Sequence, residues 1–315
     1  MRFELTILGS SSALPTSQRN LTAHVLNVYE RFFLIDCGEG TQMQLRKNRI
    51  KFGRINHIFI SHIHGDHIYG LFGLLSSFNL LDRTEDLHIY AHEPLRKGIR
   101  YMIRNYEGRF NYAIRFHPID PGKKQKIYED LRLQVYSFPL SHKIPSSGFL
   151  FVEKPRELNI RKGYVKKYNI PVRNIHEIKN GADYTTPEGI TIPNEEITEP
   201  PYRQRSYAFC SDTAYDEQII PHIRQVDLLY HEATFRDEHQ DQADYTLHST
   251  AREAGRMARK ANVKQLIIGH FSARYKEEQI EALSAEAREE FTQTISAYDG
   301  MTHVVHPYRV PRRED

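Results

Sequence analysis

Residues 57–70 read His-Ile-Phe-Ile-Ser-His-Ile-His-Gly-Asp-His-Ile-Tyr-Gly and dominate the interpretation of the whole chain. The apolar run at 58–60 is typical of a buried strand, and an apolar segment from 68 to 81 follows it. The turn between them carries four donors suited to Zn²⁺, namely His62, His64, Asp66 and His67. One catalytic zinc keeps a coordination position open, so four donors are too many for it, and the spacing predicts two metal ions side by side. A histidine-rich surface turn is the alternative, but such turns do not usually lie between an apolar strand and an apolar helix.

The composition is that of a soluble globular protein, with 315 residues, 39% of them hydrophobic and 26% charged. No stretch approaches the roughly 20 apolar residues that span a bilayer. The first five residues continue into a strand pattern rather than a signal peptide. Cys37 and Cys210 are the only cysteines, which predicts no disulfide framework and a reducing cytoplasm. We therefore expect a cytoplasmic protein without membrane contact.

Short strands and helices alternate along residues 1–315, which predicts a single α/β domain. Several predicted strands end in a residue that can bind a metal, and these residues are His62, His142, Asp212, His231 and His270. Each alone is better explained as a buried histidine or a helix cap. Five at equivalent positions favour a polar site held at one edge of a rigid sheet.

The seven candidate ligands form two groups that share one carboxylate. His62, His64 and His142 are assigned to one zinc ion and Asp66, His67 and His270 to the other, with Asp212 offering one oxygen to each. Two zinc ions about 3.5–4 Å apart can activate water and neutralise the oxygens of a phosphodiester. Asp66 also lies close enough in sequence to accept or orient the proton of the attacking water, as a general base.

The departing oxygen of a phosphodiester needs a proton, and His248 is our candidate donor. Glu232, one residue beyond a strand end, is the expected carboxylate that fixes its ring and raises its pKa. The alternative for His248 is a plain polar residue ahead of a helix. That helix is expected to run to about Ala261 with Ser249 as its N-cap.

Residues 153–204 break the regular pattern and are expected to form an inserted arm. Within 154–173 there are seven lysines and arginines against one acidic residue, Glu157. With Tyr164 and Tyr168 interleaved, such an arm is suited to a phosphate backbone. From charge alone, a solvated surface hairpin is an equally good interpretation.

Five stretches carry a resemblance to known families. Residues 61–67, Ser-His-Ile-His-Gly-Asp-His, resemble the HxHxDH signature of the metallo-β-lactamase fold. The His-Glu-Ala-Thr at 231–234, the His-Ser-Thr at 248–250 and the block at 270–275 are similar to motifs of the ribonuclease Z family, as are residues 36–42. The resemblance implies an αβ/βα sandwich with an inserted flexible arm at about 153–204.

The resemblance also implies a metal-dependent endoribonuclease with two Zn²⁺ per subunit. Its substrate would be precursor tRNA, cut after the discriminator base to leave a 3′-hydroxyl on the tRNA and a 5′-phosphate on the trailer. Family members are homodimers in which the arm of one subunit grips the tRNA bound at the other subunit's active site. The substrate contacts that the resemblance suggests are Arg19, Thr250 and Arg274 in the catalytic part and Lys162, Lys166 and Lys167 in the arm.

Two positions depart from the family pattern. Ser17 replaces the lysine of the early loop, and Pro171-Val172 stands where the arm usually carries Gly-Pro. A phosphodiesterase or esterase of the same fold that acts on small molecules is the main alternative, although it would not explain the arm or the combined motifs. A non-catalytic RNA-binding module is the second alternative, and the complete set of seven ligands argues against it.

Overall fold

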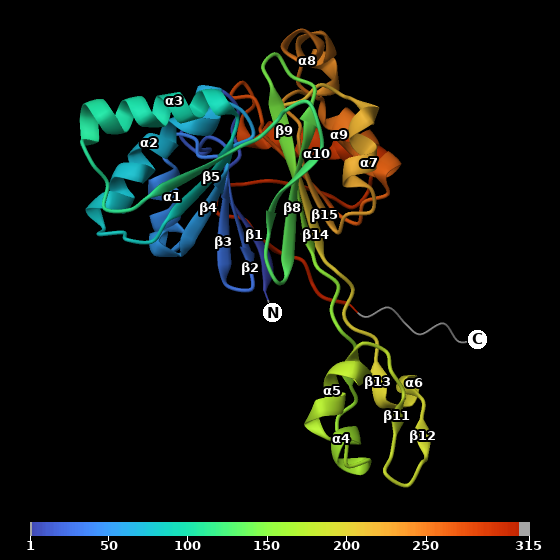
Figure 1. The fold of residues 1–315 in the computed structure, drawn as a ribbon. Helices are drawn as coiled ribbons and strands as arrows, with labels where there is room; N and C mark the ends of the chain where they lie inside the picture. Colours follow the sequence, from blue (N-terminus) through green and yellow to red (C-terminus); the bar gives the residue numbers. More distant parts are fainter. Residues whose placement is uncertain (1, 309–315) are drawn as a thin grey trace. The chain divides into compact units, whose positions relative to one another are not determined.

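A computed structural model describes residues 2–308, which form two compact units (Figure 1). Residues 2–152 and 206–305 make up the first unit, and residues 153–205 with 306–308 make up the second. All seven candidate metal ligands belong to the first unit. In the described part of the chain, no helix is long and apolar enough to cross a membrane.

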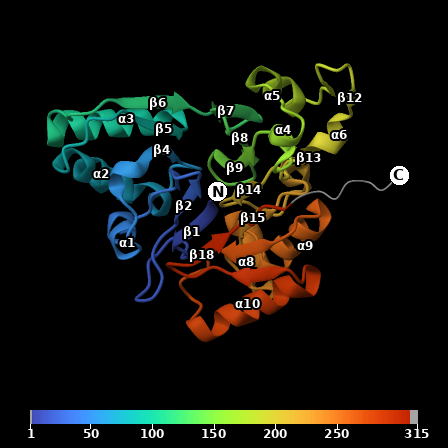
Figure 2. The same cartoon turned by 90° about the horizontal axis from the view of Figure 1, so that it is seen from below.

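The first unit is a four-layered sandwich in which two seven-stranded sheets face each other (Figures 1 and 2). The strand order is β18-β1-β2-β3-β4-β5-β6 in one sheet and β17-β16-β15-β14-β9-β8-β7 in the other. The strands of the first sheet are β1 (Phe3–Gly9), β2 (Ala23–Val28), β3 (Arg31–Ile35), β4 (Ile55–Phe59), β5 (Leu87–Ala91), β6 (Ile114–Pro118) and β18 (Thr302–Val304). Those of the second are β7 (Gln125–Glu129), β8 (Leu133–Leu140), β9 (Ser146–Glu153), β14 (Ser206–Cys210), β15 (Leu228–Glu232), β16 (Leu266–Gly269) and β17 (Thr294–Ser296).

Helices cover the outer face of each sheet. On the first sheet lie α1 (Thr41–Lys47), α2 (Gly65–Leu80) and α3 (Glu93–Met102), and on the second lie α7 (Ile220–Ile223), α9 (Ala251–Ala261) and α10 (Glu277–Glu290). The short helix α8 (Gln240–Thr246), three 3₁₀ turns (Phe52–Arg54, Glu217–Ile219 and Asp237–His239) and a π-helical turn (Ile103–Glu107) complete this unit.

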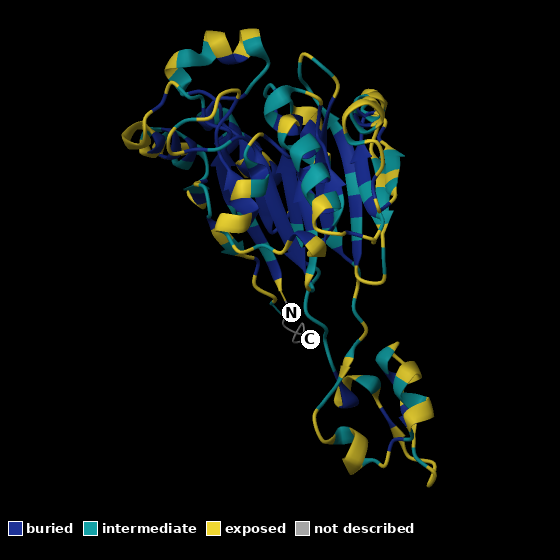
Figure 3. Cartoon of the chain, turned by 90° about the vertical axis from the view of Figure 1, so that its left-hand side faces the viewer, coloured by how far each residue is buried: buried dark blue, intermediate teal, exposed yellow. Residues whose placement is uncertain are grey.

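Burial on both faces explains the composition of the strands. All six residues of β2 are buried, as are all five of β15 and all four of β16. Strands covered on both faces read as continuous apolar runs rather than as alternating patterns. Figure 3 shows the buried sheets between helices whose outer faces are exposed. The resulting core is rigid, and the residues at the strand ends are held in fixed positions.

The predicted strand before the ligand turn and the predicted helix after it are confirmed as β4 and α2, but one helix cap was predicted wrongly. Thr250, not Ser249, is the N-cap of α9, and Thr250 forms a capping box with Glu253. The hydroxyl of Ser249 instead donates a hydrogen bond to the carbonyl of Thr213, at 2.7 Å. Helix α3 ends at Met102, and the chain continues directly into the π-helical turn.

The second unit has a small core of its own. Its elements are β10 (Asn159–Ile160), α4 (Tyr164–Lys167), α5 (Val172–Lys179), β11 (Tyr184–Thr185), β12 (Thr191–Ile192), α6 (Asn194–Ile197) and β13 (Thr198–Glu199). Two two-stranded ladders, β10 with β13 and β11 with β12, accompany these helices. The buried residues at its centre are Ile170, Ile178, Tyr184, Ile192 and Ile197.

Candidate active site

The turn after β4 places four candidate ligands at the start of α2. Helix α2 begins at Gly65, so Asp66 and His67 lie in its first turn. The helix packs closely on the chain that follows β3, because a Cβ atom at Gly70 would lie 2.0 Å from the carbonyl oxygen of Gly38. Only glycine permits this approach, which holds the ligand-bearing turn against the first sheet.

The other three candidate ligands each follow a different strand of the second sheet. His142 comes shortly after β8, Asp212 after β14 and His270 directly after β16. Strands β14, β15 and β16 run parallel, so their carboxyl ends lie at one edge of the sheet. Residues far apart in sequence therefore converge at that edge.

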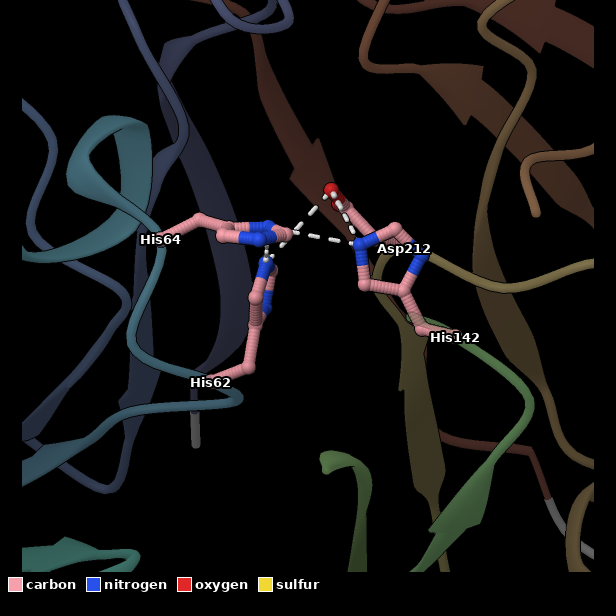
Figure 4. Close-up of side chains that lie close together, drawn as sticks. All are labelled: His62, His64, His142 and Asp212. Carbon is pink, nitrogen blue, oxygen red and sulfur yellow. Dashed lines mark hydrogen bonds and ion pairs between the residues drawn. The ribbon is translucent and has the colours of Figure 1, made fainter. Parts of the chain in front are cut away.

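The first group of donors consists of His62, His64, His142 and Asp212 (Figure 4). The Nδ1 atom of His64 lies 3.0 Å from Nε2 of His62 and 3.3 Å from Nε2 of His142. The Oδ2 atom of Asp212 lies 3.5 Å from Nε2 of His62 and 3.9 Å from Nε2 of His142. All four donor atoms thus face one small volume.

The second group consists of Asp66, His67, His270 and again Asp212. The Oδ1 atom of Asp212 lies 3.3 Å from Nε2 of His67 and 3.1 Å from Nε2 of His270. The Oδ2 atom of Asp66 lies 3.4 Å and 3.6 Å from the same two nitrogens. Both Nε2 atoms are buried without a hydrogen-bond partner in the described residues, which is expensive unless a ligand occupies the space.

These groups fit metal ions by chemistry and by spacing. Donors at tetrahedral Zn²⁺ bond lengths lie about 3.4 Å from one another, and the separations above range from 3.0 to 3.9 Å. Asp212 directs one carboxylate oxygen to each group. The residues could therefore hold a metal at each group, with Asp212 shared between the two.

Hydrogen bonds from behind fix the orientation of the histidines. The Nδ1 atom of His67 lies 2.7 Å from Oδ2 of Asp36, and Nδ1 of His270 lies 2.9 Å from the hydroxyl of Thr234. The Nδ1 atom of His142 lies 2.9 Å from the carbonyl oxygen of Leu247. Such partners aim the opposite ring nitrogen at the site.

Sequence reasoning missed Asp36 as a supporting residue, although a usable signal was present. Asp36 follows β3 directly, so it obeys the rule that identified the residues at the other strand ends. Its carboxylate also accepts hydrogen bonds from the backbone NH and the hydroxyl of Ser61, at 2.7 and 2.8 Å. Asp36 thereby ties β3 to the ligand turn.

His248 and Glu232 lie together beside the two groups. The Nδ1 atom of His248 lies 2.7 Å from Oε1 of Glu232, and its Nε2 atom lies 4.0 Å from Oδ2 of Asp212. Burial would lower the pKa of His248, but the carboxylates of Glu232 and Asp212 outweigh it and raise that pKa to about 9. The imidazole therefore carries a proton at neutral pH in the arrangement described. Glu232 is itself fixed by the backbone NH groups of Thr213 and Thr234.

Asp66 receives an additional hydrogen bond from the loop that follows β1. The backbone NH of Ala13 donates to its Oδ2 atom at 2.8 Å. Burial alone would raise the pKa of Asp66, but the charge of His67 and the contact with His270 hold it well below the ordinary value. Asp66 is therefore ionised, as both a ligand and a proton acceptor require.

A cavity of about 530 Å³ opens onto both donor groups. Its lining includes His64, Asp66, His142, Asp212 and His270, together with the candidate proton donor His248. Its size suits a small segment of a larger substrate.

The structure places the remaining predicted contacts in different environments. Arg19 is buried, forms an ion pair with Glu277 and donates to the carbonyl of Tyr275 at 2.6 Å. Thr250 is buried and caps α9, whereas Arg274 is exposed, with its guanidinium 5.1 Å from the ring centre of Phe235. Contact of these residues with substrate stays a prediction.

Comparison with known proteins places the fold and then the family. The metallo-β-lactamase fold protein YhfI from Bacillus subtilis has a TM-score of 0.68 at 15% identity, covering 97% of this chain and 100% of that one. The short form of human tRNase Z has a TM-score of 0.69 at 26% identity, covering 95% and 98%. The fold and the site thus define a hydrolase of the metallo-β-lactamase fold.

Sequence relatives narrow this class. Ribonuclease Z from Phocaeicola vulgatus is 49% identical over 296 residues, which are 94% of this chain and 95% of that protein. A family model described as "Anti-Pycsar protein Apyc1" matches residues 3–161, which include the ligand turn but not Asp212, His248 or His270. The chain belongs to the ribonuclease Z family, and over residues 3–161 it also falls within the family that this model describes.

Proposed function

We propose that this protein is a zinc-dependent endoribonuclease that removes the 3′ trailer from precursor tRNA. It cuts after the discriminator base and leaves a 3′-hydroxyl on the tRNA and a 5′-phosphate on the trailer. The observation that carries the proposal is the pair of donor groups sharing Asp212, with the His248–Glu232 pair beside them. The near full-length likeness to ribonuclease Z supports the choice of substrate.

The residues of the site divide the work of hydrolysis. Two zinc ions, when bound, supply Lewis acidity that favours ionisation of water and neutralises phosphate oxygens. Asp66 accepts or orients the proton of the attacking water, and the NH of Ala13 holds its carboxylate in place. His248 donates a proton to the departing 3′-oxygen, and Glu232 fixes the ring that carries it.

The second unit is proposed as the arm that binds the body of the tRNA. Lys162, Lys166 and Lys167 are exposed there, as a phosphate contact requires. The ammonium group of Lys167 lies 4.8 and 4.6 Å from the ring centres of Tyr164 and Tyr168, so part of its interaction is already used within the unit. We propose a homodimer in the cytoplasm, in which the arm of one subunit serves the active site of the other.

Cleavage of a labelled precursor tRNA with a 3′ trailer tests the proposal. We expect a single cut after the discriminator base, lost on metal depletion and restored by added zinc. Precursors with and without an encoded CCA sequence should be compared, because Ser17 replaces the family's lysine. Turnover of bis(p-nitrophenyl) phosphate without any cut in the precursor would favour the small-molecule phosphodiesterase instead.

Charge substitutions in the second unit test the arm. The double substitution Lys162→Ala and Lys166→Ala should weaken tRNA binding and reduce the salt dependence of binding by about one ion per lysine. Lys167→Ala is the matched variant and should have a smaller effect, because Lys167 already interacts with two tyrosines. Unchanged tRNA affinity in the double variant would show that these lysines do not contact tRNA.

A further inference from the structure

The active-site cavity has an apolar wall that the hydrolytic chemistry does not use. Leu14, Pro15, Leu21 and Tyr69 line the cavity beside the two donor groups. All four belong to the part of the chain that forms the first sheet and its helices, whereas Lys143 lines the cavity from the second. A scissile phosphate and its sugar need cations and hydrogen bonds, so an apolar wall indicates a further component of the substrate.

Tyr69 is held directly against the ligand turn. A Cβ atom at Gly65 would lie 2.3 Å from Cε2 of the Tyr69 ring, so the ring packs on the backbone of that glycine. The residue nevertheless remains 64% exposed. Its hydroxyl forms no hydrogen bond with any residue that the structure describes, so the ring itself is the group presented to a ligand.

Leu14 is presented in a comparable way by the loop after β1. It is 66% exposed, yet its carbonyl oxygen accepts a hydrogen bond from the Ser11 hydroxyl at 2.8 Å. The preceding residue, Ala13, is bound to Asp66. Two large apolar side chains are thus kept at the cavity, Tyr69 by the packing of its ring on Gly65 and Leu14 by a hydrogen bond to its backbone, although burial elsewhere would stabilise them more.

We propose that Tyr69 and Leu14 form a binding site for a nucleobase that flanks the scissile phosphate. An aromatic ring that makes no hydrogen bond stacks on bases of any sequence, since every base has a π-face. The cationic side of the cavity at Lys143, whose ammonium lies 4.5 Å from the Tyr245 ring centre, suits the neighbouring phosphate. This inference rests on the proposed function and assigns the residues that position the unpaired end of the RNA.

Two small phosphodiesters distinguish an effect on base binding from an effect on hydrolysis itself. The p-nitrophenyl ester of thymidine 5′-phosphate carries a base, and methyl p-nitrophenyl phosphate does not, while both release the same phenolate. We expect the protein to prefer the nucleoside ester and Tyr69→Ala to reduce kcat/KM for it by about 5- to 100-fold. The kcat/KM for the methyl ester should change less than twofold in Tyr69→Ala. Tyr69→Phe should retain the preference, and Leu14→Ala should weaken it.

Tyr106→Ala is the matched control, since Tyr106 is 75% exposed and does not line this cavity. Metal content is measured for every variant. An equal loss on both esters, or a loss of metal in Tyr69→Ala, would show that the ring only supports the Gly65 turn and would overturn the inference.

Precursor tRNAs with an abasic nucleotide on either side of the cut complete the test. If one abasic precursor is cut more slowly than the normal precursor, the missing base is the one that is bound. Tyr69→Ala should remove this difference in cleavage rate. Equal cleavage of both abasic precursors and the normal one would overturn the base site. A protein that prefers the nucleoside ester but cuts no precursor would instead refute the proposed function.

Discussion

The two halves of the sandwich supply the candidate metal donors in different ways. The first provides four from a single turn, His62 to His67, whereas the second provides His142, Asp212 and His270 from three separate strand ends. The first set is therefore local, and the second exists only because the sheet brings its strand ends together. Of the seven candidate ligands, Asp212 alone faces both donor groups, so a residue of the second half links the two groups.

The largest effect should come from the shared carboxylate. Asp212→Asn removes a charge from both groups, and we expect turnover of a small phosphodiester to fall about 10³-fold, since each ion contributes several kcal/mol. Metal analysis should show weaker binding of both ions. His64→Ala, which affects one group only, should retain one ion. Retention of both ions at wild-type affinity in Asp212→Asn would contradict the shared role.

A substitution of His248 tests whether the second half also supplies a proton donor that is not a metal ligand. His248→Ala should lower turnover by roughly 10²-fold or more, because the departing oxygen loses its proton donor. Metal content should be unchanged, since our assignment gives His248 no metal. A variant that loses metal would identify His248 as a ligand instead.

The residues that hydrogen-bond to the candidate ligand histidines allow a finer comparison of the two halves. Asp36→Asn, behind His67, should weaken metal binding by about 10- to 100-fold, the range for such partners. Thr234→Val, behind His270, should weaken it less, because a hydroxyl carries no charge. Titration of each variant with zinc and a competing chelator measures the metal affinity of both variants. An equal effect would show that hydrogen bonding, rather than charge, sets the orientation.

Thr250 should give the smallest effect. Thr250→Ala removes the N-cap of α9 and should reduce the free energy of unfolding by about 1 kcal/mol. Turnover of a small phosphodiester should stay within twofold if capping is its only role. Ser249→Ala is the comparison, because its hydroxyl bonds a carbonyl outside the helix. A large loss of turnover in Thr250→Ala alone would support the phosphate contact that the family resemblance suggests.

The ligand turn and most elements were predictable because their signals are local. The apolar run before His62 and the donors after it lie within one window of sequence, and the strand-end rule extended to Asp212 and His270. Comparison with known proteins confirms the fold and the family. The ligand and catalytic roles themselves stay predictions, although the structure brings the seven side chains together as two groups.

What the sequence did not predict depends on contacts between distant segments. Asp36 obeys the strand-end rule, but its place behind a ligand rather than at the metal site is decided only when the ring of His67 is placed against it. The NH of Ala13 carries no sequence signal at all, because every residue except proline has one. Thr250 and Ser249 are both good N-caps, and the capping box with Glu253 favours Thr250, while the hydroxyl of Ser249 is taken by the distant carbonyl of Thr213.

The point at which the chain leaves the first unit for the second has a consequence for protein engineering. Val152 and Ser206 are direct register partners on the antiparallel strands β9 and β14, so the chain departs from and returns to a single rung of the ladder. A short hairpin turn can close that rung without altering the length of either strand. We therefore expect that residues 153–205 can be removed, or exchanged for the equivalent segment of a related protein, while the sandwich stays the same.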